Sequence, residues 1–179
     1  MRNVMLRLIL LSLLLLPTFL SACTTLALSG DDQSAVYATV VRQMYTVDHT
    51  YGDHPPNWPT VYLLRATDDR AGDPRETEAR SKLLEESVQE AIVAALDDLP
   101  AELIWIDDRS EAINGNIMEV KGDGVLVTLG NIYPQGGGTV HVAASIYFAS
   151  TGAGGWTYIL EQIDGIWKIT GNTGVSWIS

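Results

Sequence analysis

The chain has 179 residues, a length typical of one domain of common size. The chain contains 22 Asp and Glu residues and 11 Lys and Arg residues, which gives a net charge of −11. The first 22 residues contain Arg2 and Arg7 but no acid, so removal of that segment changes the net charge to about −13. This charge argues against nucleic acid as a partner, because phosphate binding needs clustered Lys and Arg, and against flat docking on anionic lipid headgroups.

Residues 1–22 have the three parts of an export signal. Arg2 and Arg7 give a positively charged start, and residues 8–16 form an apolar run that is shorter than a membrane-spanning helix requires. Pro17 then ends the run, and the sequence Leu20-Ser21-Ala22-Cys23 follows. Cys23 is the one cysteine of the chain, so no second thiol exists to pair with it.

This tetrapeptide resembles the lipobox of bacterial lipoproteins, which reads aliphatic, small, small, Cys. The resemblance covers residues 1–23 and implies cleavage between Ala22 and Cys23, with a diacylglyceryl group on the Cys23 thiol. It also implies an extracytoplasmic protein anchored to the cell membrane or the outer membrane, since several acyl chains on one residue make a stable anchor. The alternatives are an ordinary signal peptide with Cys23 incidental, or a retained signal anchor.

Residues 23–33 are expected to form the lipidated cysteine and a tether, and residues 34–179 a single domain. The periodicity predicts a helix from Ser34 to Val47, with Asp31 or Asp32 as its N-terminal cap. Its apolar stripe is Tyr37, Val40, Val41 and Met44. The stretch from His49 to Pro59 is expected to be a loop, because it contains three prolines and a glycine. A strand is predicted over Val61–Thr67.

A second helix is predicted to start at Asp73 and to run to Asp98. Asp73 would cap it, Pro74 suits the first helical position, and Glu76 completes a capping box. Leu103–Ile106 is expected to be a short strand, and residues 107–121 to be mostly irregular.

From Gly124 onward the pattern predicts an antiparallel meander. The expected strands are Val125–Tyr133, Thr139–Ala149, Trp156–Ile163, Ile166–Thr170 and Val175–Ile178. Asp164-Gly165 between strand residues favours a two-residue type I′ turn, which sets Ile163 opposite Ile166 and Glu161 opposite Lys168.

These elements together predict an α+β fold in which two N-terminal helices pack on a curved antiparallel sheet, a meander of four to five C-terminal strands. The order is similar in outline to the NTF2-like and cystatin-like folds. The ending from Trp156 to Ser179 also resembles a group of uncharacterised small secreted bacterial proteins, a resemblance that implies no activity.

The motif Asp48-His49, followed by Asp53-His54, is the cluster of ligand-type residues in the sequence. Two His five residues apart, each beside an Asp, can bind zinc or another divalent metal if the loop folds back on itself. The alternative is a polar loop between a helix and a strand, because a metal site normally needs a third or fourth ligand held on rigid structure.

Other candidates fit structural roles at least as well. Asp107, Asp108 and Glu111 could do acid–base work or bind calcium, or could be a solvated strand end. The serines lack the context of a nucleophile elbow. The tryptophans of the predicted strands would belong to the core, or would form a concave face for an apolar ligand. These tryptophans are Trp105, Trp156, Trp167 and Trp177.

The sequence therefore favours a lipid-anchored envelope protein that acts as a binding or interaction module, with no cofactor besides the covalent lipid on Cys23. The membrane is the expected partner through this anchor, together with an unidentified protein or small-molecule ligand. The alternative function is an enzyme or metal-binding protein that uses the His49–His54 loop or a cavity in the sheet.

Overall fold

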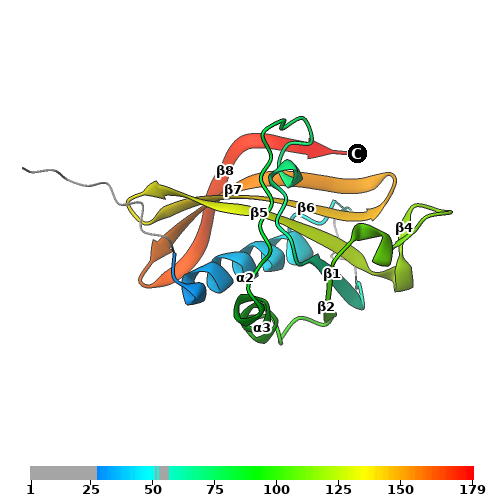
Figure 1. Cartoon of the computed structure of the whole chain (residues 1–179), viewed down its shortest axis with the longest axis horizontal. Coiled ribbons are helices and arrows are strands. Elements are labelled where there is room, and N and C mark those ends of the chain that lie inside the picture. Colours follow the sequence, from blue (N-terminus) through cyan, green and yellow to red (C-terminus); the bar gives the residue numbers. More distant parts are fainter. Residues whose placement is uncertain (1–27, 51, 53–56) are drawn as a thin grey trace, which may run out of the picture.

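The computed structural model describes residues 28–50, 52 and 57–179. A six-stranded sheet carries two helices, α2 (Gly30–Thr46) and α3 (Glu86–Ala95), on one face (Figure 1). The strands of this sheet are β1 (Thr60–Leu64), β2 (Glu102–Ile106), β5 (Val125–Gly136), β6 (Thr139–Ala149), β7 (Gly152–Ile163) and β8 (Ile166–Ile178). A small hairpin pairs β3 (Ile113–Asn114) with β4 (Glu119–Val120), and single 3-10 turns are η1 (Asp69–Ala71), η2 (Arg109–Glu111) and η3 (Lys121–Asp123).

Helix α2 forms where the apolar stripe predicts a helix, but it begins at Gly30. Ser29 is its N-cap, since the Ser29 hydroxyl oxygen accepts from the Asp32 backbone N–H at 3.1 Å. Asp32, expected as a cap, instead accepts a hydrogen bond from the indole Nε1–H of Trp167 on β8 at 3.0 Å. This bond, helped by the Ser29 hydroxyl, lowers the pKa of Asp32 and fastens the start of the helix to the edge strand.

The prediction of two N-terminal helices on an antiparallel meander is wrong, first because the second helix does not start at Asp73. The Asp73 carboxylate accepts from both the backbone N–H and the guanidinium of Arg75, each at 3.0 Å, and so closes a local turn. Further along, Ala66 and Leu83 pair as an isolated antiparallel bridge. These bonds replace helical ones, and α3 begins only at Glu86.

The same prediction is wrong about the sheet, which is mixed and not antiparallel. Its strand order is β2-β1-β5-β6-β7-β8, and β1 pairs in parallel with both β2 and β5. Helix α3 is the connection from β1 to β2, and a crossover of this kind returns the chain to the same end of the sheet. The NTF2-like outline is therefore not the observed architecture, since one helix precedes the sheet and the other lies between two parallel strands.

The C-terminal strands pair in chain order, and the predicted hairpin register is confirmed. Ile163 faces Ile166, and Glu161 faces Lys168. Asp164 and Gly165 have φ angles of 53° and 77°, as a type I′ turn requires. The two last predicted strands are one continuous strand, β8, which follows β7 through two register shifts.

The main core lies between the helices and the sheet. Fully buried side chains of α2 meet the facing residues of β1, β5, β6 and β7. They include Val36, Val40, Val41 and Met44 from the helix and Leu63, Val127, Val142 and Leu160 from the sheet.

The segment between β1 and α3 covers the opposite face of the sheet, and Figure 1 shows it crossing the strands in green. Asp69 holds it there, because its carboxylate accepts from the backbone N–H of Asn131 at 2.8 Å and from the Tyr133 hydroxyl at 2.5 Å. The indole Nε1–H of Trp177 donates to the Ala71 carbonyl at 2.9 Å.

Candidate functional site

The residues of the predicted metal loop that the structure describes are bound into the core. Asp48 accepts from the Tyr158 hydroxyl at 2.8 Å and from the Gln43 amide at 3.1 Å. Burial, and then the Asp48 charge, raise the pKa of the Tyr158 hydroxyl above its ordinary value. The His49 ring is buried against Trp58, with centroids 6.4 Å apart.

Asp53 and His54 lie outside the described residues, as do Ala22 and Cys23 of the lipobox. Within the part of the chain that the structure describes, no three His, Cys, Asp or Glu side chains come together as a metal site would require. The metal prediction therefore stays a prediction, and the described half of the loop, Asp48 and His49, has a packing role.

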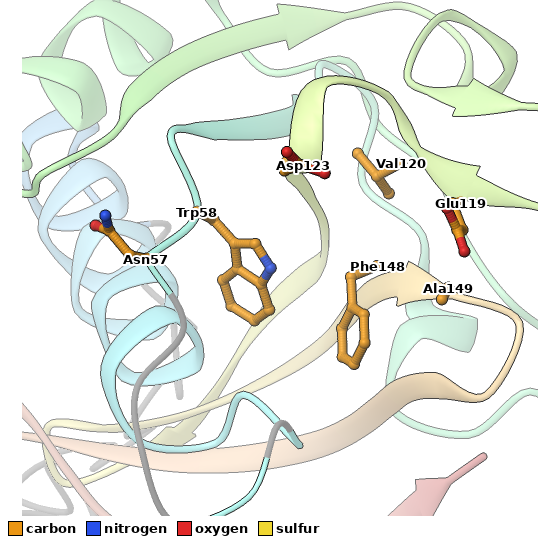
Figure 2. Close-up of a pocket in the computed structure, with 8 residues that line it drawn as sticks. Asn57, Trp58, Glu119, Val120, Asp123, Phe148 and Ala149 are labelled. Carbon is orange, nitrogen blue, oxygen red and sulfur yellow. The ribbon is translucent and has the colours of Figure 1, made fainter.

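A cleft of about 420 Å³ lies beside this loop, at the end of the sheet where β6 turns into β7. Two aromatic side chains and two acids line it together with smaller groups, as Figure 2 shows. The acidic cleft is defined by Asn57, Trp58, Glu119, Val120, Asp123, Gly124, Phe148 and Ala149.

The aromatic wall of the acidic cleft begins with Trp58, which precedes β1. Its indole is only 5% exposed and packs against Tyr45 and Phe148, with ring centroids 5.9 Å and 5.6 Å away. The Tyr45 hydroxyl donates to the Trp58 carbonyl at 3.0 Å, so helix α2 fixes the backbone that carries the indole. Trp58 is therefore a rigid part of the cleft wall.

Phe148 is placed by an irregularity in the sheet. The pairing of β6 with β7 shifts register between Tyr147 and Ala149, and such a bulge re-aims the side chain at that position. The ring lies over Gly152, where a methyl group would approach two of its carbons to 2.2 Å. Because Gly152 has no side chain, the Phe148 ring can occupy the space over this position and pack against Trp58 (Figure 2).

Glu119 and Asp123 form the acidic side of the cleft. The ion pairs among the described residues are Arg42–Asp98, Arg65–Asp107, Arg70–Asp68 and Arg75–Asp73, so neither Glu119 nor Asp123 takes part in one. The nearest lysine in sequence, Lys121, donates to the carbonyls of Ser110 and Glu111 at 3.3 Å and 2.7 Å. Neither carboxylate therefore has a basic partner among the described residues.

Two of the four described non-glycine residues with a positive φ lie at or beside these acids. Asp123 and Met118 have φ angles of 53° and 55°, a region that non-glycine residues rarely adopt. The Tyr147 hydroxyl donates to the Met118 carbonyl at 2.6 Å and so ties the β3–β4 hairpin to β6.

Comparison with protein-family models, with curated proteins and with solved structures finds no match to this chain. Within residues 28–50, 52 and 57–179, no helix is both long enough and apolar enough to cross a membrane.

The other candidates from the sequence have structural roles. Asp108 accepts from the Ser110 N–H at 2.8 Å, and Glu111 accepts from the backbone N–H of Asp107 and of Asp108, each at 2.8 Å. These bonds form a capping box for η2, and the Ser110 hydrogen bonds lower the pKa of Asp108. The acid cluster is thus the cap of a turn.

The tryptophans of the strands do not share one concave face. Trp167 belongs to the main core, and Trp105 and Trp156 are partly buried and pack against it. Trp177 instead donates to the Ala71 carbonyl on the opposite face. Sequence reasoning missed the acidic cleft, because its four principal residues come from a loop, a short hairpin, a turn and a bulge. The signals that could have pointed to it are the Gly122-Asp123-Gly124 turn and the bulky Phe148 shortly before Gly152.

Proposed function

We propose that this chain is a lipid-anchored extracytoplasmic protein whose domain binds a small organic cation in the acidic cleft. The observation that carries the proposal is the pair of carboxylates, Glu119 and Asp123, which line the cleft opposite Trp58 and Phe148 and have no ion-pair partner among the described residues. An ammonium group beside an apolar body matches both halves of this lining.

Electrostatics support a cation over a neutral or anionic ligand. The chain has a net charge of −11, so its field attracts cations toward the surface and repels anions. An anion in the cleft would meet two like charges at close range, which disfavours binding. The aromatic wall favours a ligand with an apolar portion, because it gives that portion a surface already turned away from water.

The lipid anchor in this proposal is supported by the sequence of residues 1–23. The positively charged start, the short apolar run and the lipobox ending at Cys23 occur in the order that export and lipidation require. Lipid on Cys23 would hold the domain near the membrane surface, because only a few residues separate Cys23 from the start of α2.

Benzylammonium is a suitable probe, with benzyl alcohol and benzoate as neutral and anionic controls of nearly the same shape. We expect benzylammonium to bind with a dissociation constant on the order of 1 mM, as its size allows, and to shift the amide NMR signals of Phe148 and Glu119. Benzoate should cause no such shifts. Equal binding of the three compounds would refute recognition of a cation.

The double variant Glu119→Gln/Asp123→Asn keeps the shape of the cleft and removes its charge. Asn tolerates the positive φ at position 123, so the turn is retained. The matched control, Glu76→Gln/Glu78→Gln, removes two charges from the exposed segment that covers the other face. Benzylammonium affinity should fall about tenfold in the first variant and stay within about twofold in the control.

A further inference from the structure

Strand β2 forms one edge of the sheet, and its outer side is open. Among the residues that the structure describes, β2 pairs with β1 and with no other strand. An open edge presents unpaired backbone N–H and C=O groups to any extended chain that approaches it.

The register shows which groups these are. The Glu102 N–H donates to the Pro59 carbonyl and the Arg65 N–H donates to the Ile106 carbonyl, each at 2.9 Å. In a parallel ladder alternate residues bond to the same neighbour, so Glu102 and Ile106 both point their backbone groups toward β1. The N–H and C=O groups of Leu103 and Trp105 therefore point away from β1, toward the open edge.

A groove of about 430 Å³ lies beside this edge, between β2 and helix α3. The Trp105 groove is lined by Arg65, Glu86, Gln89, Glu90, Val93, Ala94 and Trp105. Trp105 is part of this lining, and among the described residues its buried indole Nε1–H has no hydrogen-bond acceptor. A buried donor without an acceptor costs about 1–3 kcal/mol, so an incoming oxygen atom would be favoured there.

The charged residues of the groove favour an incoming chain of opposite charge. Glu86 and Glu90 stand on α3 and are in none of the ion pairs among the described residues. The one basic residue of the lining, Arg65, is already paired with Asp107 at 3.1 Å. The groove therefore combines apolar surface from Val93, Ala94 and Trp105 with net negative charge.

We propose that the edge of β2 binds an extended, basic segment of a partner protein as an added strand. The segment pairs with the backbone of Leu103 and Trp105, places one apolar side chain in the Trp105 groove, and sets basic residues against Glu86 and Glu90. This site is separate from the acidic cleft, so it does not depend on the proposed binding of an organic cation.

A fluorescent five-residue peptide with sequence KTLTK and blocked ends is the probe, because alternate side chains of a strand share a face, so its two lysines and its leucine all face the groove. Two N-methylated forms carry methyl groups either on the amides of the lysines and the leucine or on the amides of the threonines. In an added strand only one set of alternate amides faces β2, so one form should bind about tenfold more weakly than the other. Binding slows hydrogen exchange at the amides of Leu103 and Trp105. Equal affinity of the two forms, or no binding of KTLTK at all, overturns the proposal.

Two tryptophan variants separate binding from stability. Trp105→Phe removes a donor that has no acceptor among the described residues, so peptide binding should weaken at least threefold with little change in melting temperature. Trp177→Phe removes a donor that already binds Ala71, so the melting temperature should fall and peptide binding should persist. If both variants bind the peptide like the unaltered protein, the edge site is wrong.

Charge is tested with Glu86→Gln/Glu90→Gln, with Glu76→Gln/Glu78→Gln as the control of equal charge change. The first variant should lose several-fold affinity for KTLTK and the control should keep it. An acidic peptide, ETLTE, should not bind. Binding of ETLTE as tight as that of KTLTK overturns the choice of a basic partner, and dimerisation of the protein without peptide would identify a second copy as the occupant instead.

Discussion

The Phe148 ring lies against Gly152 because that position has no side chain, and Gly152→Ala tests this arrangement directly. A methyl group there would lie 2.2 Å from two ring carbons, well inside van der Waals contact, so the ring must move. Overpacking of this kind costs about 1–3 kcal/mol of unfolding free energy. Displacing the ring also removes an aromatic contact worth about 0.5–1.5 kcal/mol, which corresponds to roughly a two- to tenfold loss of benzylammonium affinity.

The matched control is Gly171→Ala, since a methyl group at Gly171 meets nothing within 4 Å. Urea unfolding gives the free-energy difference between the two variants, and an NMR titration with benzylammonium gives the affinity. In the double variant Gly152→Ala/Phe148→Ala the added methyl group has room, so its cost should largely disappear. Equal stability and equal affinity of the two glycine variants would refute the placement of Phe148 in the cleft.

Three further predictions address the hairpin, the segment over the sheet and the anchor. Gly165→Val should lower the unfolding free energy by more than about 1 kcal/mol, because a β-branched residue resists the φ of 77°, and an unchanged urea midpoint would contradict the hairpin. Burial of Asp69 opposes its ionisation, but hydrogen bonds from Tyr133, Asn131 and Arg80 outweigh burial and lower its pKa. Because the pKa of Asp69 is lower in the folded state, its ionised form stabilises the protein at pH values above the unfolded pKa of about 4, and this stabilisation is lost as the pH falls through the folded pKa. Asp69→Asn should therefore cost roughly 2 kcal/mol of unfolding free energy at pH 7 and less toward pH 3. A cost that stays constant with pH would refute this. Cys23→Ser should abolish labelling with a radioactive fatty acid and leave uncleaved precursor, whereas a normally cut, membrane-bound product would contradict lipidation of Cys23.

Local sequence determined the elements whose bonds lie close together along the chain. The Asp164-Gly165 turn needs only two residues that tolerate positive φ, so the register of Glu161 with Lys168 followed from it. The helix over Tyr37–Met44 follows from an apolar stripe that any neighbouring sheet can bury. The export signal and lipobox in residues 1–23 are likewise linear motifs, and lipid anchoring at Cys23 remains a prediction from sequence.

Tertiary structure decided the features that depend on distant partners. The capping pattern at Asp73 is compatible with a helix, but Arg75 and the bridge between Ala66 and Leu83 offer that segment competing bonds. The parallel direction of β1 and β2 depends on the path of the chain through α3, which side-chain alternation does not encode.

The acidic cleft shows the same division most clearly. Trp58 precedes β1, Glu119 and Asp123 follow β3, and Phe148 lies at a bulge, so no sequence spacing links them. Each residue alone is compatible with an ordinary core or surface position. The packing of β6 against the β3–β4 hairpin brings the two carboxylates close to Trp58 and Phe148. These residues are distant in the sequence, so the tertiary fold and not a sequence motif places them together.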